Sequence, residues 1–353
     1  MFQFDQVKDS RSLFSLAKRP LKVGGIFLFL VLFLWGGVSF FFAPKPFDTL
    51  SGTLYLTLAP QGEKVTDLYQ FDVKTHQFTK MFDDNFIKYT GKFSPSGEKM
   101  AFASALLDRS STFFLPSKEF LQIKVYDRNT GVITKLTDIN TLNKRIGGWS
   151  PDGKNIAFTS QAFTRYPNIE EAIKSFYKPD NWSLDTVDVD GKTEHIDAGT
   201  NSVWSPDGTR LLFLKNDGLY IRALSGEKSE KVYSLSEQYV ATNMKLGLSH
   251  DGRHLALGFP NKNQLLIFEI LSWNPFSSKL VSRIMKEGKL IFWPVFSPDD
   301  RYIVFQEVDF YPDHSQTLLS PRLVAYDTVT SRYLELANLD QYNFNFAFID
   351  DWS

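Results

Sequence analysis

Residues 149–153 read Trp-Ser-Pro-Asp-Gly, and residues 156–159, Ile-Ala-Phe-Thr, follow closely. In such a turn, Ser and Asp side chains bond nearby backbone N–H groups, Pro presets φ, and Gly takes the positive-φ position that closes the hairpin. The short apolar run after the glycine is typical of a strand buried on both faces. This stretch therefore predicts a β-hairpin whose first strand ends at Trp149.

The same hairpin recurs along the chain, with anchor residues 44 to 56 positions apart. Because every copy repeats the same turn residues, we expect one architectural role for them, although Asp152, Asp207, Asp251 and Asp299 are also possible metal ligands. The five copies begin at Phe93, Trp149, Trp204, Leu248 and Phe296.

A second hairpin follows each copy after a variable loop. In one repeat, residues 123–127 and 132–136 flank the turn residues Asn129-Thr130-Gly131. Two hairpins make a four-stranded antiparallel sheet, which is the blade of a β-propeller. Further second hairpins are predicted at 67–81, 184–196, 219–233, 265–284 and 323–336.

The two ends of this repetitive region complete one more blade between them. Residues 53–58 and 67–81 provide three strands before the first turn copy, and residues 342–351 look like the first strand of a further repeat. Pairing 342–351 beside 53–58 would close the ring and leave no exposed edge. The fold class predicted is all-β, a six-bladed propeller of four-stranded antiparallel blades, preceded by one N-terminal transmembrane helix.

The pattern W-S-P-D-G-x-x-I-A-F, followed by D-L-Y-x-x-D, resembles the PD40 or WD40-like repeat of the TolB family. The resemblance covers nearly all of residues 52–353. It implies a TolB-like six-bladed propeller and protein or peptide binding at a propeller face. Similar propellers also serve as peptidase domains and sugar-acid lyase scaffolds, so the fold alone does not assign a function. The chain lacks the separate α/β domain of TolB, which puts a TolB-type role in doubt.

The segment 23–43 carries no charged residue and is long enough, at about 1.5 Å per residue, to cross a bilayer as a helix. A cleaved signal peptide is the closest alternative, but the apolar run is long and no A-x-A-like site ends it. The basic tail 1–22 predicts a cytoplasmic N-terminus by the positive-inside rule. We therefore expect a single-pass protein of the cell membrane, with a linker at 44–51 and an extracytoplasmic propeller at 52–353.

The composition excludes several kinds of chemistry. The chain has no cysteine, and its formal net charge is −1, so neither thiolate sites nor a basic nucleic-acid footprint is indicated. A nucleophile elbow and a phosphate-binding glycine loop are absent from the sequence. The sequence therefore predicts no catalytic residue, no metal ligand and no cofactor, although a lyase could gather histidines from several blades.

The first strand of each blade should line the central channel. The inserted loops at 106–118 and 162–181 could add binding surface or be tolerated padding. Because a strand reverses its face at each residue, a channel position could be misassigned by one. The predicted channel-lining residues are Tyr89, Arg145, Asn201, Lys245, Trp293 and Asn343.

These channel residues mix aromatic, basic and amide groups, which suit the carboxylates and carbonyls of a peptide, or a sugar acid. The function expected from the sequence is a membrane-anchored protein or peptide interaction module of a bacterial cell envelope. The alternative is a propeller enzyme, a lyase or hydrolase, that acts on envelope polysaccharide or sugar acids. A channel without any ligand and a bare structural tether remain further possibilities.

Overall fold

The computed structural model describes residues 47–63, 65–106, 121–138, 141–162, 181–215, 217–226, 228–235, 245–259, 263–309 and 319–353. Within these ranges, no helix is long and apolar enough to cross a bilayer. The tail 1–22, the segment 23–43 and most of the loops 106–118 and 162–181 lie outside the described residues, so the expectations for them stay predictions.

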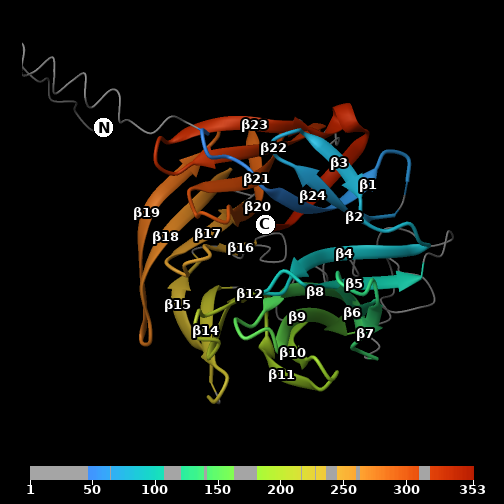
Figure 1. Ribbon diagram of the computed structural model, residues 1–353. Helices are drawn as coiled ribbons and strands as arrows, with labels where there is room; N and C mark the ends of the chain where they lie inside the picture. The colour runs from blue at the N-terminus through green and yellow to red at the C-terminus, as the bar shows by residue number, and fades with distance from the viewer. Residues whose placement is uncertain are drawn as a thin grey trace, which may run out of the picture. The chain divides into compact units, whose positions relative to one another are not determined.

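Six antiparallel sheets of four strands make up the described part of the chain. Figure 1 shows the sheets following one another around a common centre, near which the C-terminus lies. Five sheets use four strands that are consecutive in sequence, whereas the first takes its inner strand from the other end of the chain. The predicted six-bladed propeller with four-stranded blades is confirmed.

Each blade has an inner strand at the centre of the ring and a second strand beside it. From blade 1 to blade 6 the inner strands are β24 (Phe344–Trp352), β4 (Phe86–Phe93), β8 (Thr141–Trp149), β12 (Thr200–Trp204), β16 (Leu246–Leu248) and β20 (Lys289–Phe296). The second strands are β1 (Thr53–Pro60), β5 (Lys99–Leu106), β9 (Asn155–Ala162), β13 (Arg210–Lys215), β17 (His254–Phe259) and β21 (Tyr302–Asp309).

The outer half of each blade is the second predicted hairpin. The third strands are β2 (Asp67–Asp72), β6 (Gln122–Asp127), β10 (Trp182–Asp188), β14 (Gly218–Ala223), β18 (Gln264–Trp273) and β22 (Leu319–Asp327). The outermost strands are β3 (Gln77–Lys80), β7 (Ile133–Lys135), β11 (Thr193–Ala198), β15 (Glu230–Ser234), β19 (Phe276–Met285) and β23 (Arg332–Asn338), and the 3₁₀ turn η4 (Leu339–Tyr342) precedes β24.

The ring is closed in blade 1, where β24 pairs antiparallel with β1. Leu54 lies opposite Trp352, and backbone bonds join Thr53 and Ser353 in both directions, at 2.6 and 3.0 Å. Leu54, Ile349 and Trp352 are buried in the same hydrophobic cluster. The predicted closure by the C-terminal strand is therefore confirmed.

The S-P-D-G turns have the predicted chemistry. In blade 3, the Ser150 hydroxyl donates to Asp152 Oδ1 at 2.5 Å, and the Lys154 amide donates to the same oxygen at 3.1 Å. The hydrogen bond from Ser150 is the main cause that lowers the pKa of Asp152. Ser205, Ser249 and Ser297 make the same contact with the aspartate two positions on. These aspartates thus stabilise the turns in which they lie.

The strand directions give the propeller two distinct faces. One, here called the turn face, carries the S-P-D-G turns and the turns between third and outermost strands, which hydrogen bonds such as Leu224 N to Thr209 O hold together at 2.9 Å. The opposite face, here called the loop face, receives the ends joined by the longer connections, including the inserted segments after Leu106 and Ala162. The strand ends that flank the insertions and the architectural turns are therefore on different faces.

Tryptophan anchors link neighbouring blades. Trp149 Nε1 donates to the Lys92 carbonyl at 2.9 Å, and Trp204 Nε1 donates to the Gly148 carbonyl at 3.0 Å. Each acceptor directly precedes the anchor of the preceding blade. The indole N–H therefore finds a partner within an apolar interface, as buried tryptophan requires.

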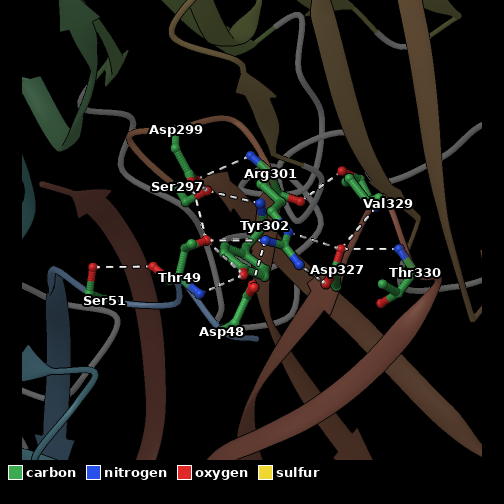
Figure 2. A network of polar contacts seen from close by, with 11 residues as sticks. Asp48, Thr49, Ser51, Ser297, Asp299, Arg301, Tyr302, Asp327, Val329 and Thr330 are labelled. Carbon is green, nitrogen blue, oxygen red and sulfur yellow. Dashed lines mark hydrogen bonds and ion pairs between the residues drawn. The ribbon is translucent and has the colours of Figure 1, made fainter. Parts of the chain in front are cut away.

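Residues 47–51, here called the entry segment, pack on the turn face of blade 6. Phe47 stacks on Tyr302 with ring centroids 5.9 Å apart, and Asp48 accepts a hydrogen bond from Arg301 at 2.6 Å. Arg301 also donates to Asp327 Oδ2 at 3.0 Å. Figure 2 shows Arg301 between the two aspartates, with Thr49 beside the Ser297 turn. This part of the expected linker is thus attached to the propeller.

Candidate functional site

The predicted channel residues lie on or beside the inner strands. Tyr89, Arg145, Asn201 and Trp293 belong to β4, β8, β12 and β20, whereas Lys245 directly precedes β16. At this level, three of the bulged inner strands have a left-handed residue: Thr90, Asn201 and Trp293 have φ of 51°, 53° and 48°. A bulge redirects the side chains that follow it, so simple alternation does not give their direction.

Lys245 joins blades that are not neighbours. Its ammonium group donates to the carbonyl of Ile349, on the inner strand of blade 1, although blade 6 lies between blades 5 and 1. The charges of Lys92, Arg145, Asp350 and Asp351 also act on Lys245. We call these five residues the axial cluster, because charges from the inner edges of four blades interact only where those edges converge.

Asp350 is the most enclosed member of the axial cluster. Its side chain is fully buried, and its Oδ2 accepts a hydrogen bond from the Thr57 hydroxyl at 2.6 Å. Among the residues that the structure describes, its Oδ1 has no hydrogen-bond partner. Burial raises the pKa of Asp350, and the opposing effects of Lys245 and the Thr57 hydrogen bond are smaller. Its pKa is raised to about 6, so this carboxyl group becomes neutral, and able to donate a hydrogen bond, at a higher pH than an exposed aspartate does.

The cationic members of the cluster repel one another. Burial is the main cause that lowers the pKa of Lys245, and the charge of Lys92 lowers it further, against the attraction of Asp350. Lys92 lies 3.7 Å from Asp351, which also accepts the Phe93 amide at 2.8 Å. Lys92, Arg145 and a Lys245 whose pKa is lowered to about 7 face two acidic side chains, so the cluster carries a small excess of positive charge that suits an anionic group.

Beside Asp350, hydrogen bonds link β1, the second strand of blade 1, to the inner strands of blades 2 and 3. The Thr90 amide donates to the Thr57 hydroxyl at 2.9 Å, and the Ile146 amide donates to the Thr90 hydroxyl at 3.0 Å. Each threonine hydroxyl thus gives a backbone amide of the next blade's inner strand a hydrogen-bond partner. The axial cluster is therefore held by a fixed backbone frame.

Aromatic side chains occupy the side of blades 6 and 1. The Trp293 ring lies 5.1 Å from that of Phe292 and 4.3 Å from that of Phe348. On blades 2 and 3, burial raises the pKa of Tyr89, partly offset by a hydrogen bond with Thr66 and by the charge of Arg145. Cationic and aromatic groups thus meet at the inner strands.

The remaining predicted residues have local roles. Asn201 donates through Nδ2 to the Thr200 hydroxyl at 3.3 Å. Asn343 caps η4 in the left-handed conformation, its side chain is exposed, and its carbonyl accepts the Gln61 amide at 2.7 Å. Of the predicted residues, Arg145 interacts through its charge with Tyr89 and Lys245. Asn343, in contrast, lies at the loop-face start of β24.

Lys92, Asp350 and Asp351 were missed among the candidates from the sequence. Lys92 and Asp351 occupy the position just before an anchor residue, in blades 2 and 1 respectively. The signal available was the acidic pair on a strand that was otherwise apolar and aromatic. Which way the two aspartate side chains point depends on which residue of the strand is bulged, and sequence alone does not show this. In the structure the bulged residue is Asp350, which the pairing with β1 skips.

A serine, a histidine and an aspartate also meet on the outer half of blade 3. His195 Nδ1 lies 3.0 Å from Ser183 Oγ and 2.9 Å from Asp185 Oδ1, while Ser183 Oγ donates to Asp185 at 2.8 Å. A hydrolytic triad uses opposite ring nitrogens for its serine and aspartate. Here a single nitrogen contacts both, so the group is a polar surface cluster and not a charge-relay arrangement.

The described histidines lie away from the axis. His76 and His250 are in turns, His195 is on an outermost strand and His254 begins a second strand, while His314 lies outside the described residues. Within the described ranges, no group of three or more His, Asp or Glu side chains is placed to hold a metal ion. The part of the inner strands that the structure describes therefore offers no histidine cluster of the kind a metal-dependent lyase would use.

A separate cavity of about 380 Å³ lies on blade 2. Lys88, at its edge, is buried and forms ion pairs with Asp67 and Asp84. The lining residues are Asp84, Phe86, Lys88, Phe102, Ser104, Lys124, Ile133 and Lys135. The lining residues come from all four strands of blade 2, and none of them belongs to the axial cluster.

Comparison with known proteins gives similarity in structure only. No protein-family model and no curated protein matches the chain. TolB from Acinetobacter baumannii aligns with a TM-score of 0.58 at 17% identity, covering 92% of this chain and 69% of that one. A chain of a nidogen/laminin complex aligns with a TM-score of 0.53 at 10% identity, covering 84% and 98%.

An oligogalacturonate lyase from Vibrio parahaemolyticus aligns with a TM-score of 0.50 at 13% identity, covering 83% of this chain and 80% of that one. A binding protein and an enzyme thus share the architecture, and identities this low show the fold alone. The chain therefore has the six-bladed propeller fold of the TolB type.

Proposed function

We propose that the protein is a membrane-anchored, extracytoplasmic propeller that binds a protein or peptide of the cell envelope at its axis. The observation that carries the proposal is the axial cluster, in which cationic side chains of three blades meet beside the Trp293 aromatic group. Its supporting frame is fixed by backbone hydrogen bonds, as a preformed binding site requires.

The chemistry of the cluster suits a peptide. Lys and Arg donate charge-assisted hydrogen bonds to carboxylates and carbonyls, and the aromatic rings of Phe292, Trp293 and Phe348 provide an apolar contact. Neither the Ser183 group nor the described histidines have the geometry of a catalytic site. Binding is therefore favoured over catalysis.

The membrane anchor belongs to the same proposal. It is supported by the uncharged segment 23–43 and by the excess of basic residues before it. In this arrangement, the N-terminus is cytoplasmic and the propeller is presented to envelope partners on the other side.

Photo-crosslinking in intact membranes tests the proposal. A photoreactive residue replaces Glu287, which is exposed in the connection between β19 and β20 on the loop face, or Val281 on the outer edge of blade 5 as a position control. We expect a discrete adduct with an envelope protein from position 287 only. Lys245→Met should decrease the adduct, whereas Lys279→Met, which removes an exposed lysine of β19, should not.

An adduct equally strong from position 281, or insensitive to Lys245, would contradict binding at the axis. The alternative function, a lyase or hydrolase acting on envelope polysaccharide or sugar acids, is supported by the same excess of cationic groups, which suits uronate carboxylates. Depolymerisation of an acidic glycan by the purified chain, without any protein adduct, would favour this alternative.

A further inference from the structure

The chain enters the propeller on the turn face. Thr49 Oγ1 lies 3.0 Å from the Tyr302 hydroxyl and 3.5 Å from Asp299, in the blade 6 turn. Trp352 Nε1 donates to the Ser51 carbonyl at 3.1 Å. Together with the Arg301–Asp48 ion pair of Figure 2, these contacts fix the place at which the described chain begins.

Only a short piece of chain separates the apolar segment from this point. Three residues lie between Ala43 and Phe47. Four Cα-to-Cα steps extend at most about 14 Å. If segment 23–43 spans a bilayer, the entry point on the turn face cannot lie far from the membrane surface.

The turn face also exposes aliphatic side chains around its rim. Val132, Val189 and Val329 are 55, 43 and 59% exposed in the turns between third and outermost strands of blades 2, 3 and 6. Leu224 of blade 4 is 36% exposed, and Leu271, near the same end of blade 5, is 62% exposed.

In blade 1 the corresponding aliphatic residue is buried. Val73, which follows its third strand, is 3% exposed, and Phe47 and Leu50 of the entry segment pack against the cluster that contains it. The entry segment therefore covers the corresponding aliphatic residue where the chain arrives. Each blade thus carries one aliphatic residue at the rim of the turn face, and that of blade 1 is buried.

We propose that the turn face lies on the lipid headgroups of the membrane that holds the chain, with the aliphatic side chains of blades 2 to 6 as its contacts. This proposal rests on the membrane anchor of the proposed function. It adds a defined lipid-contacting surface and directs the loop face away from the membrane, toward envelope partners.

A lipid surface fits this rim better than a protein partner does. The exposed side chains are single aliphatics on separate blades, separated by charged turn residues such as Lys154, Lys192 and Asp207. Protein interfaces are built on a contiguous, well-packed apolar centre. An interfacial membrane contact instead combines scattered apolar side chains with charged groups at headgroup level.

Fluorescence quenching on the full chain tests the proposal. Because the chain has no cysteine, a single introduced cysteine can be labelled uniquely before reconstitution. Val189→Cys and Val329→Cys report on the turn face, and Glu63→Cys and Glu287→Cys, both exposed at loop-face connections, are the matched controls. The vesicles contain phosphatidylethanolamine and phosphatidylglycerol with a nitroxide on the headgroup.

We expect the two turn-face labels, which would lie within about 10 Å of the headgroups, to lose most of their emission, and the two loop-face labels to keep it. Unchanged tryptophan emission of each variant shows that the ring is intact. Equal quenching on both faces, or quenching of the loop face alone, overturns the proposal while the anchor survives. Failure of the chain to float with the vesicles rejects the anchor and this inference together.

Discussion

The most direct test of the tertiary structure is the substitution Arg301→Met. Arg301 donates to Asp327 Oδ2 at 3.0 Å, the Asp327 side chain is fully buried, and that of Arg301 is 16% exposed. Removal of one partner from a buried pair costs about 3–5 kcal/mol because the other charge stays unpaired. Asp327 keeps hydrogen bonds from the Val329 and Thr330 amides, at 2.9 and 3.1 Å, so we expect the lower limit, about 3 kcal/mol.

The measurement is urea unfolding of the full chain in detergent at neutral pH, followed by tryptophan emission. In the double variant Arg301→Met/Asp327→Asn, the amide oxygen can still accept both backbone N–H groups without a net charge. We therefore expect it to recover about 2 kcal/mol. Asp48→Asn is the control, because Asp48 is 40% exposed and should contribute below about 1 kcal/mol.

The reasoning is refuted if the double variant is no more stable than Arg301→Met, or if Asp48→Asn is as damaging as Arg301→Met. The pH dependence provides a second check. Burial acts to raise the pKa of Asp327, but the hydrogen bonds from Arg301 and the two amides hold it below the ordinary 3.8. The stabilisation is therefore present above pH 3.8 and is lost as the pH falls through the lower, folded-state pKa. Asp327→Asn should remove this acid-sensitive part.

Three further predictions follow from particular contacts. Burial lowers the pKa of Lys144 from 10.5 to about 8. The unfolded chain therefore binds this proton first, and the free energy of unfolding falls as the pH is lowered from 10.5 toward 8. Lys144→Met should reduce this fall when unfolding free energies are measured at a series of pH values. Trp204→Phe removes the hydrogen bond to the Gly148 carbonyl and should lower the free energy of unfolding in urea by about 1–2 kcal/mol. An unchanged free energy of unfolding would contradict a stabilising role for this bond. A Cβ on Gly147 would lie 2.3 Å from Ser202 Oγ, so Gly147→Ala should lower the free energy of unfolding by about 1–3 kcal/mol, and adding Ser202→Ala should restore part of it.

The repeating turns made the architecture predictable from the sequence. The S-P-D-G pattern identifies a hairpin by local chemistry alone, and Ser150 and Asp152 make the bonds that this chemistry requires. The closing strand was predicted at 342–351, because residues 53–81 lack one strand of a blade and 342–351 look like the first strand of a repeat, and it is observed at Phe344–Trp352. Local turn chemistry and period were sufficient here, since both depend on neighbouring residues only.

The axial cluster was less predictable, because it depends on tertiary geometry. The bulges at Thr90, Asn201 and Trp293 shift the facing of the residues around them, and sequence alternation does not reveal them. Lys245 was among the candidates, but its contact with Ile349 crosses a ring whose dimensions are set by all six blades. The docking of Phe47 on Tyr302 likewise joins residues about 250 positions apart, beyond the range of any local pattern.

The shared construction of blade 1 affects biosynthesis. The strand β1 emerges from the ribosome early, but its inner partner β24 is produced only after the other five blades. Throughout translation, the edge of this eight-residue, largely buried strand therefore remains available to chaperones, and to other nascent chains. A product interrupted within blade 5 or 6 would keep that edge permanently open, which would mark it for proteolysis or aggregation.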